Sequence, residues 1–126
     1  MTYSKHSACR ADEIDGRIRE AAQRHKFGVL HVHDLAATLK GKGIDLGHEC
    51  RVYDVCNPQA ASEALRQDPK IAVVLPCRIA VTSDATGTTV STVKPTDLLR
   101  ATGLAGVEQL AGEVEREIVA IIDEAV

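Results

Sequence analysis

The segment from Arg51 to Val81 constrains the fold more than any other part of the chain. It begins with the strand-like sequence R-V-Y-D-V-C, passes through N-P into an alanine-rich stretch, and ends in the apolar run K-I-A-V-V-L-P-C-R-I-A-V. Asn57 as N-cap and Pro58 at the first helical position start a helix, because the proline ring fixes a helical φ and lacks only an N–H that has no partner there. The pattern predicts a strand, a helix and a second, very apolar strand, with Cys56 and Cys77 at the two junctions.

The rest of the sequence predicts further elements on both sides of this segment. Helices are predicted at 12–25 and 107–124, where apolar residues recur at helical spacing. A short helix is predicted at 35–39, followed by glycines that end it. Strand patterns lie at 2–7, 27–32, 79–83 and 88–93, of which 2–7 is expected to be an edge strand and 27–32 a buried one. No helix is predicted between Pro95 and Gly106, where the sequence is taken as a break.

Three local signals set the ends of these elements. Asp12 and Asp34 are predicted N-caps, because their carboxylates accept the first free N–H groups of a helix. The stretch Asp84–Gly87 predicts a hairpin loop with a glycine in a positive-φ conformation.

This mixed order of elements predicts a single α+β domain over residues 1–126. We expect a two-layer sandwich in which helices cover one face of a largely antiparallel sheet. The other face is expected to be solvated or buried against a second copy. Because many residues predicted there are valine, alanine or threonine, self-association as a homodimer or larger oligomer is expected.

The composition argues against nucleic-acid and membrane partners. The chain has a net charge of −3 with acidic and basic residues interspersed, and its only aromatic residues are Tyr3, Phe27 and Tyr53. It therefore lacks the basic patch that binds phosphate backbones and the aromatic platforms that stack on bases. The longest apolar run, Ile71–Leu75, is too short to cross a bilayer.

The cysteines predict a reducing compartment. The chain contains Cys9, Cys50, Cys56 and Cys77, no C-x-x-C pair, and no export signal at its start. A domain of this size does not need disulfides to fold, so free thiols and a cytoplasmic location are expected. The missing C-x-x-C also argues against a zinc knuckle or a thioredoxin-type motif.

Several short blocks together resemble a known family. H-D-L at 33–35, A-T-L-K at 37–40, C-N-P at 56–58 and L-P-C at 75–77 occur in the order and spacing of the family called domain of unknown function 302. The resemblance runs from about Glu13 to the C-terminus. It implies a compact α+β domain similar to one half of the TATA-binding-protein fold, often self-associating, and it implies no activity.

Cys56 and Cys77 are the first candidate site residues. Cys56 directly precedes a helix N-terminus, whose free N–H groups and dipole favour an anion, so a lowered thiol pKa is expected. Cys77 starts the next strand and is expected at the same edge of the sheet. With His33, two thiolates would form a soft site for zinc, copper(I) or iron. The alternative is that both cysteines are small hydrophobic residues that fill tight corners.

The histidines and Arg78 are further candidates. His31 and His33 lie two residues apart on a predicted strand, so both point to one face and would be able to share a metal; the alternative is a solvated outer face. Asp34 is interpreted as a helix cap rather than a catalytic carboxylate. Arg78 would either bind an anionic ligand or lie at the rim of the site.

Two functions from different classes follow, with a scaffold as the third alternative. The favoured hypothesis is a binding module that holds a metal ion or a thiol-reactive ligand, with the candidate ligand-binding residues Cys56, Asn57, Cys77 and Arg78. The second is a thiol-dependent enzyme or redox protein with Cys56 as the reactive residue and His33 or Asp34 assisting. The sequence contains no G-x-G-x-x-G, no phosphate-binding G-x-x-x-x-G-K-[ST] and no G-x-S-x-G.

Overall fold

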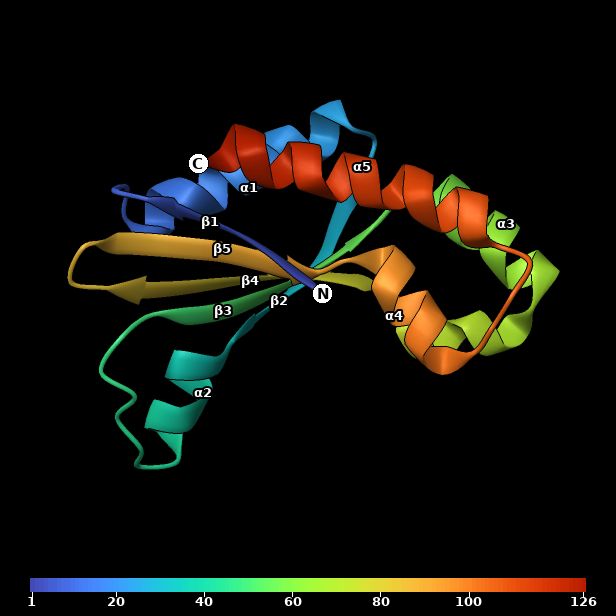
Figure 1. Cartoon of the computed structure of the whole chain (residues 1–126). Helices are drawn as coiled ribbons and strands as arrows, with labels where there is room; N and C mark the ends of the chain where they lie inside the picture. Colours follow the sequence, from blue (N-terminus) through green and yellow to red (C-terminus); the bar gives the residue numbers. More distant parts are fainter.

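The computed structural model describes residues 1–126, which form one antiparallel sheet and a set of helices (Figure 1). The strand order is β1-β5-β4-β3-β2, so β1 and β2 are the edge strands. The strands are β1 (Thr2–Ser7), β2 (Gly28–Asp34), β3 (Cys50–Cys56), β4 (Cys77–Asp84) and β5 (Gly87–Val93). The helices are α1 (Ala11–Arg24), α2 (Leu35–Gly41), α3 (Pro58–Gln67), α4 (Pro95–Thr102), α5 (Glu108–Ala125) and the 3₁₀ helix η1 (Pro69–Val74).

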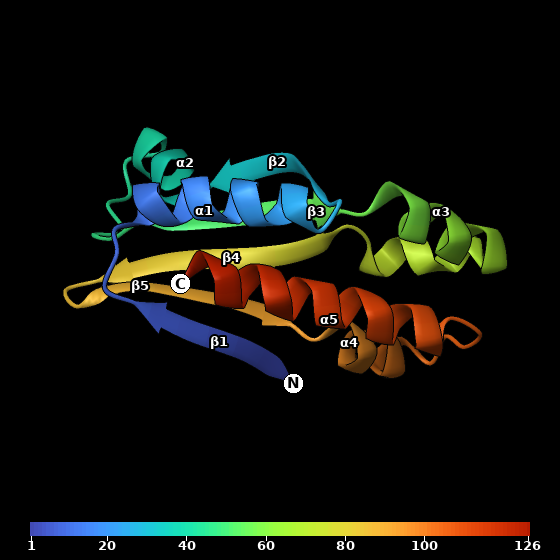
Figure 2. The ribbon, with the colours of Figure 1, turned by 90° about the horizontal axis from the view of Figure 1, so that it is seen from above.

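Helices α1 and α5 lie side by side across one face of the sheet (Figures 1 and 2). Their apolar residues recur at helical spacing, so each helix presents a continuous stripe to the strands. Successive side chains of a strand point to opposite faces, and every second residue of the inner strands therefore meets these stripes. The strand residues in this core are Tyr53, Val55, Ile79, Val81 and Val90, all fully buried. The predicted two-layer α+β fold with an antiparallel sheet is confirmed.

The opposite face of the sheet carries small and polar side chains. The register aligns Ser4, Ser91, Ala80, Val52 and His33 in one row across all five strands, and none of them is buried. Helix α2 and the loop after it lie on this side, below the sheet in Figure 1. We call this surface the open face. Self-association through it stays a prediction.

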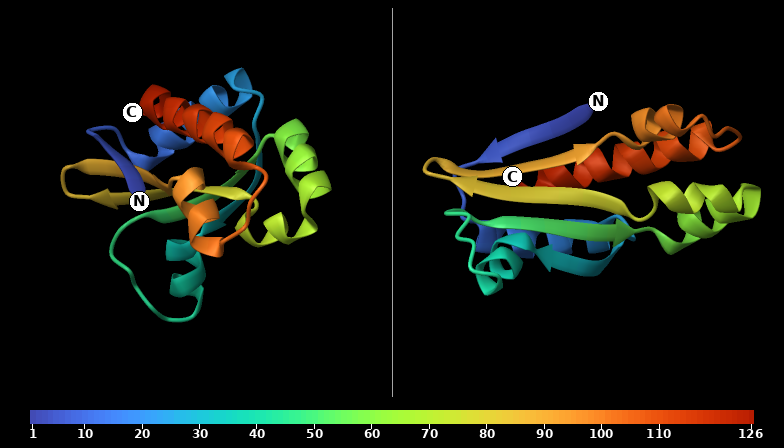
Figure 3. Two further views of the ribbon diagram at one scale, coloured as in Figure 1. Left: turned by 45° about the vertical axis from the view of Figure 1, so that its right-hand side comes forward. Right: turned by 90° about the horizontal axis from the view of Figure 1, so that it is seen from below.

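A second, smaller core lies beyond one end of the sheet. Its buried residues are Ala64 of α3, Ile71 of η1, Leu99 of α4 and Val107 at the start of α5. Figure 3 shows these helices extending past the ends of the strands, with the first half of α5 reaching over them. The buried residues of this core come from the helices and their ends, without a contribution from the strands.

Two of the predicted helix caps are confirmed. Asp34 Oδ1 accepts the backbone N–H of Ala37 at 3.0 Å and starts α2. Asn57 Oδ1 accepts the backbone N–H of Ala60 at 3.1 Å, with Pro58 at the first position of α3. Each bond satisfies one of the N–H groups that a helix leaves free at its start.

The predicted hairpin is also confirmed, with Asp84 opposite Gly87. Gly87 adopts a φ of 140°, and a Cβ added there would lie 2.1 Å from the backbone oxygen of Ser7. The hairpin and the chain that leaves β1 therefore pack closer than any side chain would allow.

Two predictions in the first half of the chain are wrong. Helix α1 starts one residue before Asp12, and the N-cap is Arg10, whose side chain makes no capping bond. Asp12 instead accepts a hydrogen bond from the Arg51 guanidinium at 2.7 Å. Strand β2 is an edge strand rather than a buried one, and its Leu30 is 61% exposed at a register irregularity.

Two further differences lie around the second core. The sequence predicts strand throughout the apolar run after α3, but residues 69–74 form η1 and β4 begins only at Cys77. Asp68 accepts the backbone N–H of Lys70 at 2.9 Å and Pro69 fixes φ, so the chain turns at the point where the strand was expected. Helix α4 was not predicted, although Pro95 at its first turn and a left-handed Gly103 after its end are both signals for it.

We predict that Tyr53→Phe lowers the free energy of unfolding by about 1–2 kcal/mol. The Tyr53 hydroxyl donates to Asp15 at 2.5 Å from a fully buried ring, and burial together with this bond raises the pKa of Tyr53 to about 12. Urea unfolding at neutral pH measures the loss. Tyr3→Phe is the matched control, because the exposed Tyr3 hydroxyl bonds to Asp123 at the surface and its loss is expected to be smaller. Equal effects of the two changes would contradict the prediction.

A second prediction concerns the contact between the ends of α1 and α5. His25 contacts the carboxylates of Glu117 and Glu124 through its two ring nitrogens. The hydrogen bond with Glu124 is the main cause of the raised pKa of His25, and the same bond is the main cause of the lowered pKa of Glu124. The raised histidine pKa stabilises the fold below about pH 6.5, and this contribution is lost as the pH rises through the folded-state value. The lowered glutamate pKa stabilises it above about pH 4.3, and this contribution is lost on further acidification.

His25→Gln is therefore expected to lower stability more at about pH 5.5 than at about pH 9. Chemical unfolding of both proteins at the two pH values measures the difference. A loss that is the same at both pH values would show that the imidazole acts through packing alone.

Candidate functional site

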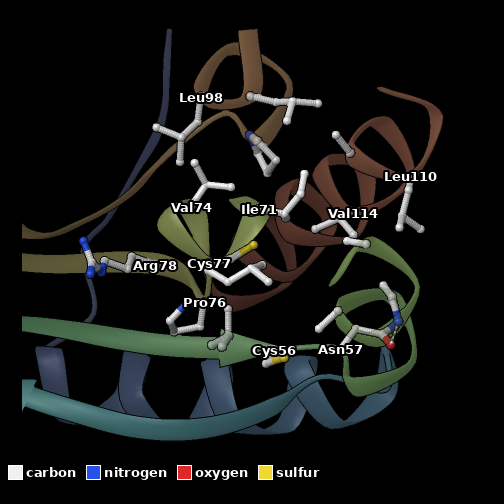
Figure 4. A pocket seen from close by; sticks show the side chains of 18 of the residues that line it. Cys56, Asn57, Ile71, Val74, Pro76, Cys77, Arg78, Leu98, Leu110 and Val114 are labelled. Carbon is white, nitrogen blue, oxygen red and sulfur yellow. Dashed lines mark hydrogen bonds between the residues drawn. The ribbon is translucent and has the colours of Figure 1, made fainter. Parts of the chain in front are cut away.

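The second core encloses a cavity of about 280 Å³ at the ends of β3 and β4 (Figure 4). Of the 23 residues that line it, 18 are hydrophobic. They come from α3, η1, α4, α5 and the strand ends, and include Ala61, Ile71, Val74, Leu98, Leu110 and Val114. The cavity is therefore a partly open, apolar hollow lined mainly by helices.

The local sequence explains why space remains there. Asn57 and Pro58 turn the chain from β3 directly into α3, so this helix starts at the cavity wall. The residues of α3 that line the cavity are Ala60, Ala61 and Ala64, whose side chains end at a methyl group. On the other side, a cis peptide bond between Leu75 and Pro76 leads from η1 into β4.

Cys56 and Cys77 both line this cavity, as the sequence suggested, but they lie on opposite faces of the sheet. The register pairs Cys77 with Val55, whose side chain is buried under the helices. Because neighbouring residues of a strand alternate, Cys56 points the other way. Figure 4 shows that the two sulfur atoms do not point toward one another.

The expected low thiol pKa is wrong. Burial raises the pKa of Cys56, and burial followed by the nearby Cys56 raises the pKa of Cys77 to about 11. The Asn57 side chain occupies the N–H of Ala60, so this N–H is not available to the Cys56 thiol. Loss of water around the thiols is the main cause of both raised pKa values.

His33 lies too far along the sheet to join the cysteines. It pairs with Val52, which is four residues before Cys56 on β3, a separation of about 13 Å along an extended strand. No group of three or more histidine, cysteine, aspartate or glutamate side chains is placed to hold a metal ion. The proposed set of Cys56, Cys77 and His33 is therefore not brought together, and Asp34 is occupied as a helix cap.

His31 and His33 share the open face, as predicted, with ring centroids 4.4 Å apart. Their neighbour Asp54, which is not among the residues predicted for the site, lies opposite both His31 and Arg78 in the register. Asp54 Oδ2 is 2.7 Å from His33 Nε2, and Oδ1 is 3.7 Å from Arg78 Nε. Asp54 Oδ1 is buried and accepts no hydrogen bond. Asp54 lies between the apolar residues Tyr53 and Val55, and side chains alternate along a strand, so the sequence does indicate that Asp54 points to the face opposite theirs.

A polar recess of about 410 Å³ adjoins the apolar cavity and shares wall residues with it, among them Phe27, Asn57 and Leu110. Lys26 and Glu113 also line the recess. Lys26 has a φ of 61°, because the backbone closes the end of α1 with a bond from Phe27 N to Ala22 O. The two hollows are thus neighbours, one apolar and one charged.

Comparison with known proteins identifies the family. The family described as "Domain of unknown function DUF302" matches residues 3–125. The chain belongs to the DUF302 family. A crystal structure of an uncharacterized conserved DUF302 protein from Bacillus stearothermophilus is similar at a TM-score of 0.93 and 26% sequence identity, covering 99% of this chain and 98% of that one. No match was found among curated proteins.

The comparisons thus confirm two predictions: the family, which the C-N-P and L-P-C motifs suggested, and the α+β fold. They name no ligand or reaction. None of the helices is both long and apolar enough to span a bilayer.

We predict that Cys77 in the folded protein is alkylated by iodoacetamide at least about 100-fold more slowly at pH 7 than a free cysteine. A pKa of about 11 leaves very little thiolate, and burial further restricts access. Mass spectrometry of peptides after timed quenching measures the rate at each cysteine. The unfolded protein is the control, in which all four thiols should react alike. Rapid alkylation of Cys56 or Cys77 below neutral pH would instead favour a thiol-dependent enzyme.

Proposed function

We propose that this protein is a small binding module that holds a compact apolar ligand in the cavity between α3, η1, α4 and α5. The observation that carries the proposal is the preformed cavity of about 280 Å³ with 18 hydrophobic residues among the 23 that line it. Small-molecule sites are typically concave, mostly apolar and preformed, with a few polar groups at their margin. Arg78 and Asn57 are such polar residues here.

The cavity volume limits the size of the ligand. At about 30 Å³ for each non-hydrogen atom, as in liquid water, it admits about ten such atoms. A ligand of this size that gains about 0.5 kcal/mol for each atom binds with a Kd between about 0.1 and 1 mM. An eight-carbon chain is therefore a suitable probe.

The two thiols contribute to the wall as soft, weakly polar groups. An electrophilic ligand whose apolar body fills the cavity would be held beside Cys56 and Cys77, which is the thiol-reactive version of this proposal. Raised thiol pKa values and the missing third ligand give less support to a thiol-dependent enzyme or a metal module. All four cysteines are free, which supports a reducing, cytoplasmic setting for the module.

The test is binding of octan-1-ol, followed by two-dimensional amide NMR. Resonances of residues around the cavity are expected to shift in a saturable way. Ala61→Leu is expected to weaken binding at least about 10-fold, because its added carbons fill space that the ligand needs, at a cost to stability of about 1–3 kcal/mol. Ala101→Leu is the matched control, since Ala101 is exposed on α4 and does not line the cavity.

Urea unfolding of both variants shows whether the fold is retained. Absence of saturable shifts with octan-1-ol, or equal binding by a folded Ala61→Leu protein, would contradict the proposal and favour a scaffold whose helices leave a packing void.

A further inference from the structure

We propose that the ligand of the cavity is amphipathic and carries a single carboxylate, which Arg78 binds at the cavity mouth on the open face. This inference rests on the proposed function and adds the chemical class of the ligand. The apolar body would lie among the helices, while the charged group stays outside, where water and Arg78 are available. The ligand would thus resemble a short or medium-chain carboxylic acid.

The position of Arg78 links the cavity to the open face. It directly follows Cys77 on β4 and contributes to the cavity lining, so its stem lies at the mouth. Its guanidinium extends away from Cys77 in Figure 4. The apolar end of a ligand can therefore fill the cavity while its charged end contacts the guanidinium outside the apolar region.

The guanidinium is free to bind such a group. Its one ion pair in the structure joins Nε to Asp54 at 3.7 Å, and neither terminal nitrogen makes a hydrogen bond or ion pair. The Arg78 side chain is 71% exposed. Two terminal N–H groups in a fixed fork match the two oxygens of a carboxylate, which is the strongest arrangement for a charge-assisted pair.

Asp54 favours a single negative charge over a double one. Its side chain is only 14% exposed and is held by His33 at 2.7 Å, so the carboxylate stays close to Arg78. Because like charges repel, a ligand with two negative charges meets more repulsion from Asp54 than a carboxylate does. Asp54 accepts no hydrogen bond from Arg78 at Oδ1, so the guanidinium can turn toward a ligand without breaking one.

The polar recess on the other side of the cavity is less suited to an anion. Its Lys26 makes no ion pair, but the carboxylates of Glu113 and Glu117 line the same recess. The neighbouring cations there already contact carboxylates, as the pairing of Arg24 with Glu124 at 2.9 Å illustrates. An anionic group in the recess would therefore meet two carboxylates, Glu113 and Glu117, whereas beside Arg78 the neighbouring carboxylate is Asp54, which lies on the Nε side of the guanidinium.

The experiment compares octanoate with octan-1-ol by amide NMR titration at about pH 7.5, where the acid is ionised. The unmodified protein is expected to bind octanoate about 10-fold more tightly than the alcohol, a typical gain for one well-placed charged pair. Arg78→Gln should remove this preference by weakening octanoate binding about 10-fold, because it removes the charged partner of the carboxylate. Lys26→Gln is the matched control and should retain the preference.

The outcomes separate the two proposals. Failure of both compounds to bind would overturn the proposed function. Binding of octan-1-ol with no preference for octanoate, or loss of the preference in Lys26→Gln rather than Arg78→Gln, would overturn the inference and leave the proposed function standing. Octyl phosphate tests the argument from charge: it should bind more weakly than octanoate, and Asp54→Asn should narrow that difference. Tighter binding of octyl phosphate to the unmodified protein would contradict the preference for a carboxylate.

Discussion

The pairing of β3 with β4 is the constraint on which the rest of the structure depends. Val55 lies opposite Cys77, and this register decides which side chains of both strands face the helices. It places Val55 and Cys77 under the helical layer and leaves Asp54 and Arg78 on the open face. A slip of one residue in either strand would turn that strand over, putting the Asp54 carboxylate or the Arg78 guanidinium into the core. The apolar residues on one face and the polar residues on the other therefore favour the same register.

The cavity depends on what happens just past the ends of these strands. Helices α3 and α4 and the start of α5 lie beyond the sheet, so they cannot pack on it and instead surround their own small core. The alanines of α3 supply too little volume to fill the centre. A cavity in this place follows from helices that extend past the support of the strands. It also lies next to the one exposed guanidinium of β4, which allows one ligand to contact both regions.

The behaviour of the thiols follows from the same arrangement. A cysteine at a helix N-terminus is acidic when it keeps water and free N–H groups around it. Here burial against the apolar wall removes water from the thiols, so the pKa of each thiol rises. Strand termination and helix capping together explain the C-N-P block at 56–58. Membership of the DUF302 family agrees with this fold and names no ligand.

The sequence by itself determined the fold class, most of the elements and two of the caps, because these depend on local periodicity and on hydrogen bonds within a few residues. It also placed His31 and His33 on one face, since alternation along a strand is a local rule. Only the tertiary structure decided that β2 lies at an edge, that residues 69–74 turn into η1, and that Cys56 and Cys77 lie on opposite faces away from His33. Those outcomes depend on strand order, register and desolvation, which are set by residues far apart in the chain. The cavity and the place of Asp54 beside Arg78 belong to this second group for the same reason.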